Sequence, residues 1–155
     1  MQNDYYFNFE YDDEQNHTIN STSLPIPNSV FGSLFNSSQN RLLQGDTIIF
    51  DNLSHSANGI ISNLPADTVT LSATGSYSIR LIIYISTGSD GYIHLQKNGS
   101  NISGTDIAVN RDIHFITLET MQTAKSGDKF SVKIDCPSLT LSEGTNVILT
   151  FQQIF

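Results

Sequence analysis

The chain has 155 residues, a length that fits one domain with a hydrophobic core. Its net charge is −8 and only 14% of its residues are charged, so a basic surface for nucleic acid or anionic membranes is not expected. No apolar run approaches the ~20 residues of a membrane-spanning helix. The single cysteine, Cys136, excludes an internal disulfide and a cysteine metal cluster. A thiol cross-link between subunits stays open.

The N-terminal segment differs from the rest in charge and pattern. Residues 1–40 hold five acidic residues and no Lys or Arg. Four aromatic residues alternate and would share one face of an extended segment: Tyr5, Phe7, Phe9 and Tyr11. This stripe predicts a strand docked on its own domain, or an arm that adds as a strand to a neighbour; disorder is a third alternative. We predict an arm and linker over residues 1–29 and one domain over residues 30–155.

The first residues do not have the charged and apolar regions of a secretory signal peptide. Met1–Asp4 are polar and acidic, and aromatic residues follow them directly. We therefore expect the protein to be made in the cytoplasm and either to remain there or to be assembled there onto another structure.

Alternation with period two runs through the body of the chain, and no segment has helical periodicity. About eight strands are predicted: Leu43–Phe50, Thr68–Ser72, Tyr77–Ile85, Tyr92–Lys97, Ile102–Val109, Ile113–Met121, Phe130–Ile134 and Asn146–Phe155. Asn98-Gly99 is the strongest hairpin signal between two of them. Short strands at this spacing predict an all-β sandwich or barrel.

The segment Gly75–Ser86 carries the most information about assembly. One face of this strand is entirely apolar: Tyr77, Ile79, Leu81, Ile83 and Ile85. The opposite face is polar up to Arg80 and then turns apolar at Ile82 and Tyr84. Because an antiparallel sheet usually hides one face and wets the other, the second half of this strand predicts a further covering surface. A copy of the same chain is the simplest such surface.

Two later strands, Ile113–Met121 and Asn146–Phe155, are also apolar on both faces. A second buried face spread over three strands indicates an oligomer interface better than it indicates scattered exposed apolar residues. We predict five residues at the subunit contact: Ile82, Tyr84, Phe115, Phe151 and Phe155.

Residues that could carry catalysis are sparse. The chain has no Gly-x-Ser-x-Gly motif, and its four histidines are never three or four residues apart. We expect no enzyme activity, no catalytic, cofactor-binding or metal site, and no cofactor. His94 and His114 lie in predicted strands, and could bind a metal or sense pH if assembly brought them together. The acidic run Asp12–Glu14 could hold Ca²⁺, but such a run is usually only solvated.

Seven short segments, in this order and spacing, resemble the C1q/TNF-like jelly-roll superfamily: Val30–Asn36, Leu43–Phe50, Gly59-Ile60, Thr74–Tyr77, Leu95–Gly99, Ser126–Phe130 and Val147–Phe155. The resemblance covers residues 30–155. It implies an all-β, C1q/TNF-like jelly-roll sandwich of about eight to ten antiparallel strands. It also implies a compact homotrimer, because members of the superfamily form trimers.

Among bacterial members the chain is similar to exosporium proteins of the spore surface. These are the C-terminal domain of a collagen-like glycoprotein and the basal-layer protein that anchors it. The similarity to the basal-layer type rests on Leu24-Pro25 followed by Phe31–Asn36. Because the chain has no Gly-x-y repeat, it cannot itself be a filament. The resemblance implies a structural building block or anchor of the exosporium, with other spore-surface proteins or a filament as partners of the arm.

The same fold also serves recognition, since fold does not set function. The alternative is a receptor- or glycan-binding head module, such as the tip of a phage tail, in which case the protein would belong to a virion tail. Loops rich in Ser, Asn and Gly, at 88–91 and 99–105, could hydrogen-bond a glycan.

Overall fold

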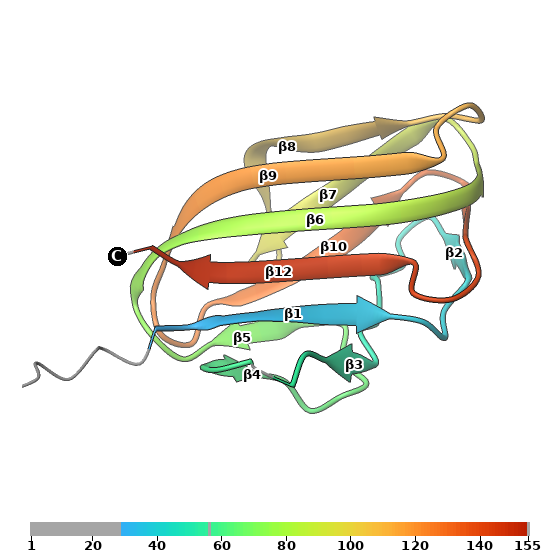
Figure 1. Cartoon of the computed structure of the whole chain (residues 1–155). Helices are drawn as coiled ribbons and strands as arrows, with labels where there is room; N and C mark the ends of the chain where they lie inside the picture. Colours follow the sequence, from blue (N-terminus) through green and yellow to red (C-terminus); the bar gives the residue numbers. More distant parts are fainter. Residues whose placement is uncertain (1–28, 56, 155) are drawn as a thin grey trace, which may run out of the picture.

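The computed structural model describes residues 29–55 and 57–154. The predicted arm residues Tyr5, Phe7, Phe9 and Tyr11, and the predicted contact residue Phe155, lie outside this part of the chain. The described residues form twelve strands and no helix, so none of them belongs to a helix able to cross a membrane. All strand pairs are antiparallel, which confirms the predicted all-β sandwich (Figure 1).

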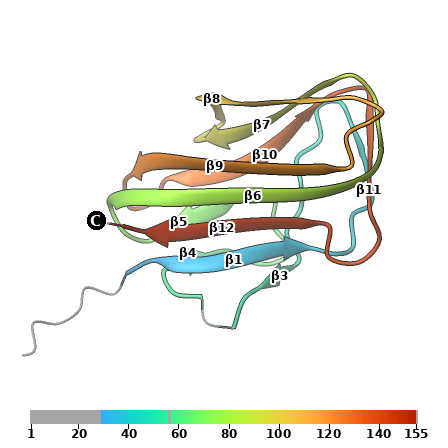
Figure 2. The same ribbon diagram turned by 45° about the horizontal axis from the view of Figure 1, so that its top comes forward.

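The larger sheet has seven strands, in the order β2-β11-β6-β12-β1-β3, with β9 along the other edge of β6. Its strands are β1 (Phe31–Asn36), β2 (Arg41–Leu43), β3 (Asn52–Leu53), β6 (Gly75–Gly88), β9 (Phe115–Ala124), β11 (Ser138–Leu141) and β12 (Val147–Gln153). The longest strand, β6, pairs with β9 over Gly75–Tyr84 and with β12 over Tyr77–Ile83. Figure 2 shows this sheet as one layer, with β9, β6, β12 and β1 side by side.

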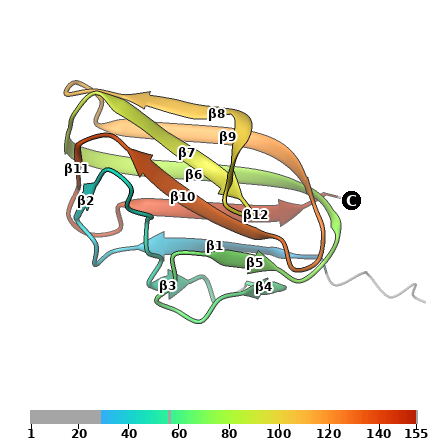
Figure 3. The ribbon, with the colours of Figure 1, turned by 180° about the vertical axis from the view of Figure 1, so that it is seen from behind.

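The smaller sheet has five strands, in the order β4-β5-β10-β7-β8 (Figure 3). Its strands are β4 (Ile60–Ile61), β5 (Val69–Leu71), β7 (Gly91–Lys97), β8 (Ser100–Val109) and β10 (Lys129–Asp135). The predicted hairpin joins β7 to β8, with Asn98 and Gly99 at φ values of 53° and 80°. Two successive positive φ values are what a two-residue turn between right-handed twisted strands requires.

The core lies between the two sheets. Every second residue of β6 from Tyr77 to Ile85 is buried, and the residues between them point outward. The same alternation places Ile93 and Leu95 of β7 and Phe130 of β10 on the inner face of the five-stranded sheet. The predicted inner face of β6 is therefore confirmed, because a period of two sends alternate side chains to opposite faces.

The predicted strand Leu43–Phe50 is wrong. After β2 the chain turns at Gly45, which has a φ of 92°. The Asp46 side chain accepts a hydrogen bond from the Leu43 backbone N–H and stabilises this turn. Beyond it, Thr47 and Phe50 form only isolated bridges to Lys133 and Ala66. The alternation was real, since Ile48 and Phe50 are buried, but it reports burial rather than continuous pairing.

Candidate functional site

An apolar patch covers one end of the outer face of the seven-stranded sheet. Five side chains form it: Phe35, Ile82, Tyr84, Phe115 and Ile148. The register places them together, because Phe35 of β1 is opposite Ile148 of β12, which is opposite Ile82 of β6. Tyr84 is opposite Phe115 of the edge strand β9. The apolar patch thus runs from β1 across the sheet to its edge.

Tyr84 and Phe115 are the most prominent members of the apolar patch. Their ring centroids lie 5.4 Å apart, with an angle of 45° between the ring planes. The exposed fraction is 39% for Tyr84 and 52% for Phe115. Beside Tyr84 and Ile148 lies a hollow of about 430 Å³, whose rim is formed by the loop residues Ser142–Thr145. Exposed aromatic rings next to a hollow are features of protein contact surfaces, where large side chains of one molecule fill recesses of another.

A polar row separates the apolar patch from the other end of the same face. Ser33 and Thr150 share a hydrogen bond of 2.8 Å across β1 and β12. Arg80 and Glu119 occupy the same row on β6 and β9, directly opposite each other. Arg80 is exposed on the outer face, between β12 and β9. A contact over this face would combine apolar burial with charges that fix its orientation.

Three of the predicted contact residues, Ile82, Tyr84 and Phe115, come together on this face. Phe151 does not: it points into the core with no exposed surface, and its ring meets Phe130 edge-on at 5.3 Å. Its side chain is therefore not available to a partner. In β12 both faces are apolar, and the sequence pattern alone could not assign Phe151 to the inner one.

Phe35 and Ile148 are members of the apolar patch that the predicted contact set lacked. The signal for Ile148 was present in the alternation of β12. The signal for Phe35 was its spacing from Phe31, since residues four apart in a strand share a face. Neither residue could be joined to Ile82 before the pairing of β1, β12 and β6 was known.

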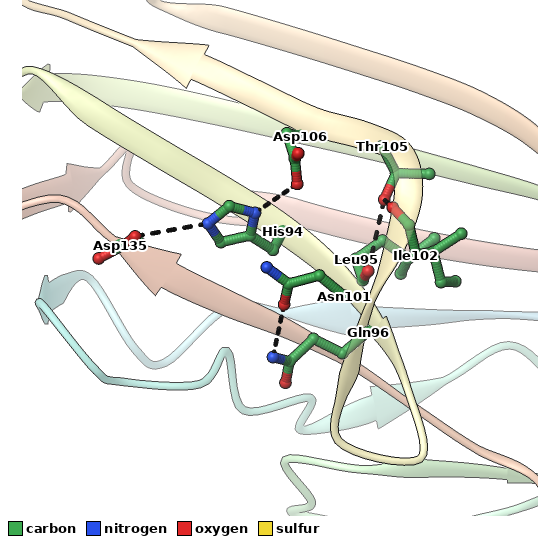
Figure 4. Close-up of polar contacts among 8 residues, drawn as sticks. All are labelled: His94, Leu95, Gln96, Asn101, Ile102, Thr105, Asp106 and Asp135. Carbon is green, nitrogen blue, oxygen red and sulfur yellow. Dashed lines mark hydrogen bonds and ion pairs between the residues drawn. The ribbon is translucent and has the colours of Figure 1, made fainter.

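The outer face of the five-stranded sheet is polar by contrast (Figure 4). His94 of β7 lies between two carboxylates on the neighbouring strands. Its Nδ1 is 2.6 Å from Oδ1 of Asp106, and its Nε2 is 3.6 Å from Oδ2 of Asp135. Gln44 donates a hydrogen bond of 2.9 Å to Asp135. Pairing of β8, β7 and β10 assembles this polar cluster from residues far apart in the sequence.

The environment of the polar cluster favours a charged Asp135. The hydrogen bond from Gln44 and then the contact with His94 lower the pKa of Asp135 below its ordinary value of 3.8. The ring of Tyr92 is stacked on the ring of His94, with 6.1 Å between their centroids, and half of the Tyr92 surface is exposed. The surface thus offers an exposed aromatic ring beside planar polar groups.

The described residues contain no group of three or more His, Cys, Asp or Glu side chains placed to hold a metal ion. His94 lies on β7 of the five-stranded sheet, whereas His114 precedes β9 and lies beside Ile85 of the seven-stranded sheet. Cys136 is buried after β10, and burial raises the pKa of its thiol. A buried thiol with a raised pKa is a poor nucleophile, so its placement favours packing over reaction.

No protein-family model matches this chain, and no curated protein sequence matches it either. Solved structures do match. Murine APRIL at pH 5.0 is 14% identical with a TM-score of 0.58, over 81% of this chain and 99% of that chain. PRD1 vertex protein P5 is 16% identical with a TM-score of 0.56, over 83% and 98%. Eiger TNF from S. frugiperda is 10% identical with a TM-score of 0.56, over 82% and 93%. At these identities the likeness concerns the fold: the chain has a TNF-like jelly-roll fold, as its resemblance implied.

Proposed function

We propose that the protein is a non-enzymatic assembly module that forms a homotrimer through the outer face of its seven-stranded sheet. The observation that carries this proposal is the apolar patch, Phe35, Ile82, Tyr84, Phe115 and Ile148, on one end of that face. A contiguous apolar surface rimmed by polar residues marks a protein contact.

The position of the apolar patch favours a ring over a two-fold pair. Phe115 lies on the edge strand β9, whereas Phe35 lies on β1, two strands beyond β6. Packing of the β9 edge of one copy against the β1–β12 part of the next joins two different surfaces. Such a heterologous contact closes into a ring when its rotation permits. The resemblance to the C1q/TNF-like superfamily implies a ring of three.

The test is the mass in solution, measured by light scattering on the full chain. The trimer has an expected mass of about 51 kDa, from three chains of 17.1 kDa. Tyr84→Glu buries a charge at the proposed contact and should give monomers, because an unpaired buried charge is costly. The matched control is Tyr92→Glu, a similarly exposed tyrosine on the other sheet, which should leave the trimer intact. A monomeric native protein, or equal effects of both variants, would contradict the proposal.

Within this assembly role we propose that the trimer is a building block or anchor of a bacterial spore surface layer, the exosporium. The support is the similarity of Leu24-Pro25 and Phe31–Asn36 to the basal-layer exosporium type. The aromatic stripe of the arm, Tyr5–Tyr11, would bind a neighbouring spore-surface protein or the base of a filament. Immunogold labelling of spores should place the protein in their outermost layer. Labelling of virion tails instead would favour the alternative.

A receptor- or glycan-binding head is the second candidate, and one observation favours it. Tyr92 exposes its ring beside His94 on the five-stranded sheet. Gln96 and Asn101 share a hydrogen bond of 2.8 Å near His94 (Figure 4). A flat aromatic ring with nearby amide groups suits a sugar, which has an apolar face and many hydroxyl groups. A specific hit on a glycan array, abolished by Tyr92→Ala, would support this function.

A further inference from the structure

One end of the sandwich carries an unusual share of the positive charge of this acidic protein. Three of its four lysines lie there: Lys97, Lys125 and Lys129. Both ion pairs among the described residues involve His94, so none of these lysines is paired with a described carboxylate. Asp128 lies among them and accepts hydrogen bonds from the Asn98 side chain and the Lys125 backbone N–H. These hydrogen bonds, and then the charges of Lys97 and Lys125, lower the pKa of Asp128.

Two of these lysines line an open hollow of about 540 Å³, here called the lysine hollow. Lys97 and Lys125 line it, together with Thr74, Asn98 and Asp128. The Nζ atom of Lys97 donates a hydrogen bond of 3.0 Å to the carbonyl oxygen of Thr123, which holds its charge at the rim. The lining of the hollow thus carries two lysines against one carboxylate, a local excess of one positive charge on a chain whose net charge is −8.

The described chain begins next to this hollow. The backbone N–H of Val30 donates to Oε1 of Gln153 at 3.0 Å, and Nε2 of Gln153 donates to the carbonyl oxygen of Thr74 at 3.2 Å. Thr74 lines the lysine hollow. Figure 1 shows the start of β1, the start of β6 and the end of β9 at this same end of the sandwich. Gln153 therefore links Val30, near the start of the described chain, to Thr74 of the hollow.

The charge of the preceding segment is complementary. Residues 1–28 contain five acidic residues and no Lys or Arg, and four of the acidic residues fall within Glu10–Glu14. Glu14 is fifteen residues before Ser29. A chain of that length spans about 50 Å when extended and about 20 Å as a flexible coil, enough to reach the hollow. Single exposed ion pairs are weak, but a tether supplies an effective concentration in the millimolar range.

We propose that the lysine hollow binds the acidic segment Glu10–Glu14 of the same molecule. Because the contact is between charged side chains, raising the salt concentration should weaken it. This inference does not rest on the proposed trimer, since the hollow belongs to one chain.

Zero-length carbodiimide coupling of the full chain tests the contact, because it joins a carboxylate to a lysine only where the two touch. Cross-links from Glu10–Glu14 to the lining residues Lys97 and Lys125 should exceed those to Lys133 by about fivefold, because only the hollow gains from the tether. Lys133 is the matched internal control, since it lies on β10 near Gly45. The excess should vanish at about 1 M salt, where the screening length is near 3 Å. Equal coupling to all four lysines would overturn the proposal.

Two further measurements test whether the contact forms within one molecule and whether it depends on the acidic side chains. In a mixture of ¹⁴N- and ¹⁵N-labelled protein, cross-linked peptides of a single isotope support binding within one molecule. Mixed isotopes would show that the hollow takes the arm of a neighbour and would overturn it. Neutralising the segment with Asp12→Asn, Asp13→Asn and Glu14→Gln should shift the amide signals of Lys125 and Asp128. Glu143→Gln, at the hollow beside Tyr84, is the control and should leave them in place; unshifted signals in the triple variant would also overturn the proposal.

Discussion

The outer face of the seven-stranded sheet carries a contiguous apolar patch, whereas the outer face of the five-stranded sheet carries hydrogen-bonded polar groups. Both faces belong to long antiparallel strands with the same inner alternation. They differ only in the residues between the core positions. Ile82 and Tyr84 occupy these positions in β6, and His94 and Gln96 occupy them in β7.

This difference separates two requirements within one fold. The inner positions stabilise the sandwich, and the outer positions decide which face stays in water. On the seven-stranded sheet a second apolar face would be left exposed in a monomer, which favours assembly. On the five-stranded sheet, outer polar side chains such as His94 and Gln96 form hydrogen bonds with neighbouring side chains and can remain in water.

The largest effect should separate the two faces of a single strand. Phe151→Ala empties a fully buried site of β12 and should lower the free energy of unfolding by about 3–5 kcal/mol. Ile148→Ala, on the outer face of the same strand, should cost the isolated domain less and weaken the oligomer more. Chemical denaturation and light scattering measure the two quantities. Similar losses of stability for both variants would remove the distinction between the faces.

The edge strand β9 offers a second comparison, on the outer face alone. Phe115→Ala removes an aromatic member of the apolar patch and should weaken assembly by about 1–3 kcal/mol. Met121 lies on the same strand beyond the polar row and is 64% exposed. Met121→Ala should nevertheless change assembly little, because Met121 is not part of the apolar patch. Sedimentation equilibrium measures both. A stronger effect of Met121→Ala would move the contact to the other end of the sheet.

The inner and outer positions of β6 could be predicted from the sequence because a polar first half marked the outer face. In β12 both faces are apolar, and only its pairing with β6 sends Phe151 inward and Ile148 outward. The same limit explains Leu43–Phe50, where alternating burial occurs without a continuous ladder. Alternation therefore identified buried residues more reliably than it identified strands or faces.

The polar cluster and the lysine hollow could not be predicted, because both depend on pairing between distant segments. His94 meets Asp106 and Asp135 only through the order β8-β7-β10. Lys97 and Lys125 line one hollow because the β7–β8 turn lies beside the β9–β10 turn, where Asn98 donates a hydrogen bond to Asp128. Sequence spacing gives no information about such encounters until the register is known.

A smaller effect concerns the hydroxyl group of Tyr77, which is buried on the inner face. It donates a hydrogen bond of 2.6 Å to the carbonyl oxygen of Ala73, and burial raises its pKa. Tyr77→Phe should lower the free energy of unfolding by about 1 kcal/mol and leave the oligomer mass unchanged. Thermal denaturation with light scattering checks both. Dissociation of the oligomer would show that this inner position acts on the contact.

The smallest effect belongs to the polar face and depends on pH. The pKa of Asp135 is lowered in the folded protein, so its contribution is complete above the unfolded value near 3.8 and is lost as the pH falls through the folded value. Asp135→Asn should therefore flatten the acid limb of the stability curve between about pH 2 and 4. Denaturant titrations across this range measure the slope. An unchanged slope would mean that Gln44 and His94 do not favour the charged form.

Hydroxyl-radical footprinting of the native assembly tests the central claim most directly, because it compares two tyrosines of similar exposure in one chain. Tyr84 and Tyr92 are 39% and 50% exposed in the single chain. If copies cover the outer face of the seven-stranded sheet, Tyr84 should be oxidised about fivefold more slowly than Tyr92, as expected for a residue in the core of an interface. Equal oxidation of the two tyrosines in the native protein would contradict the account.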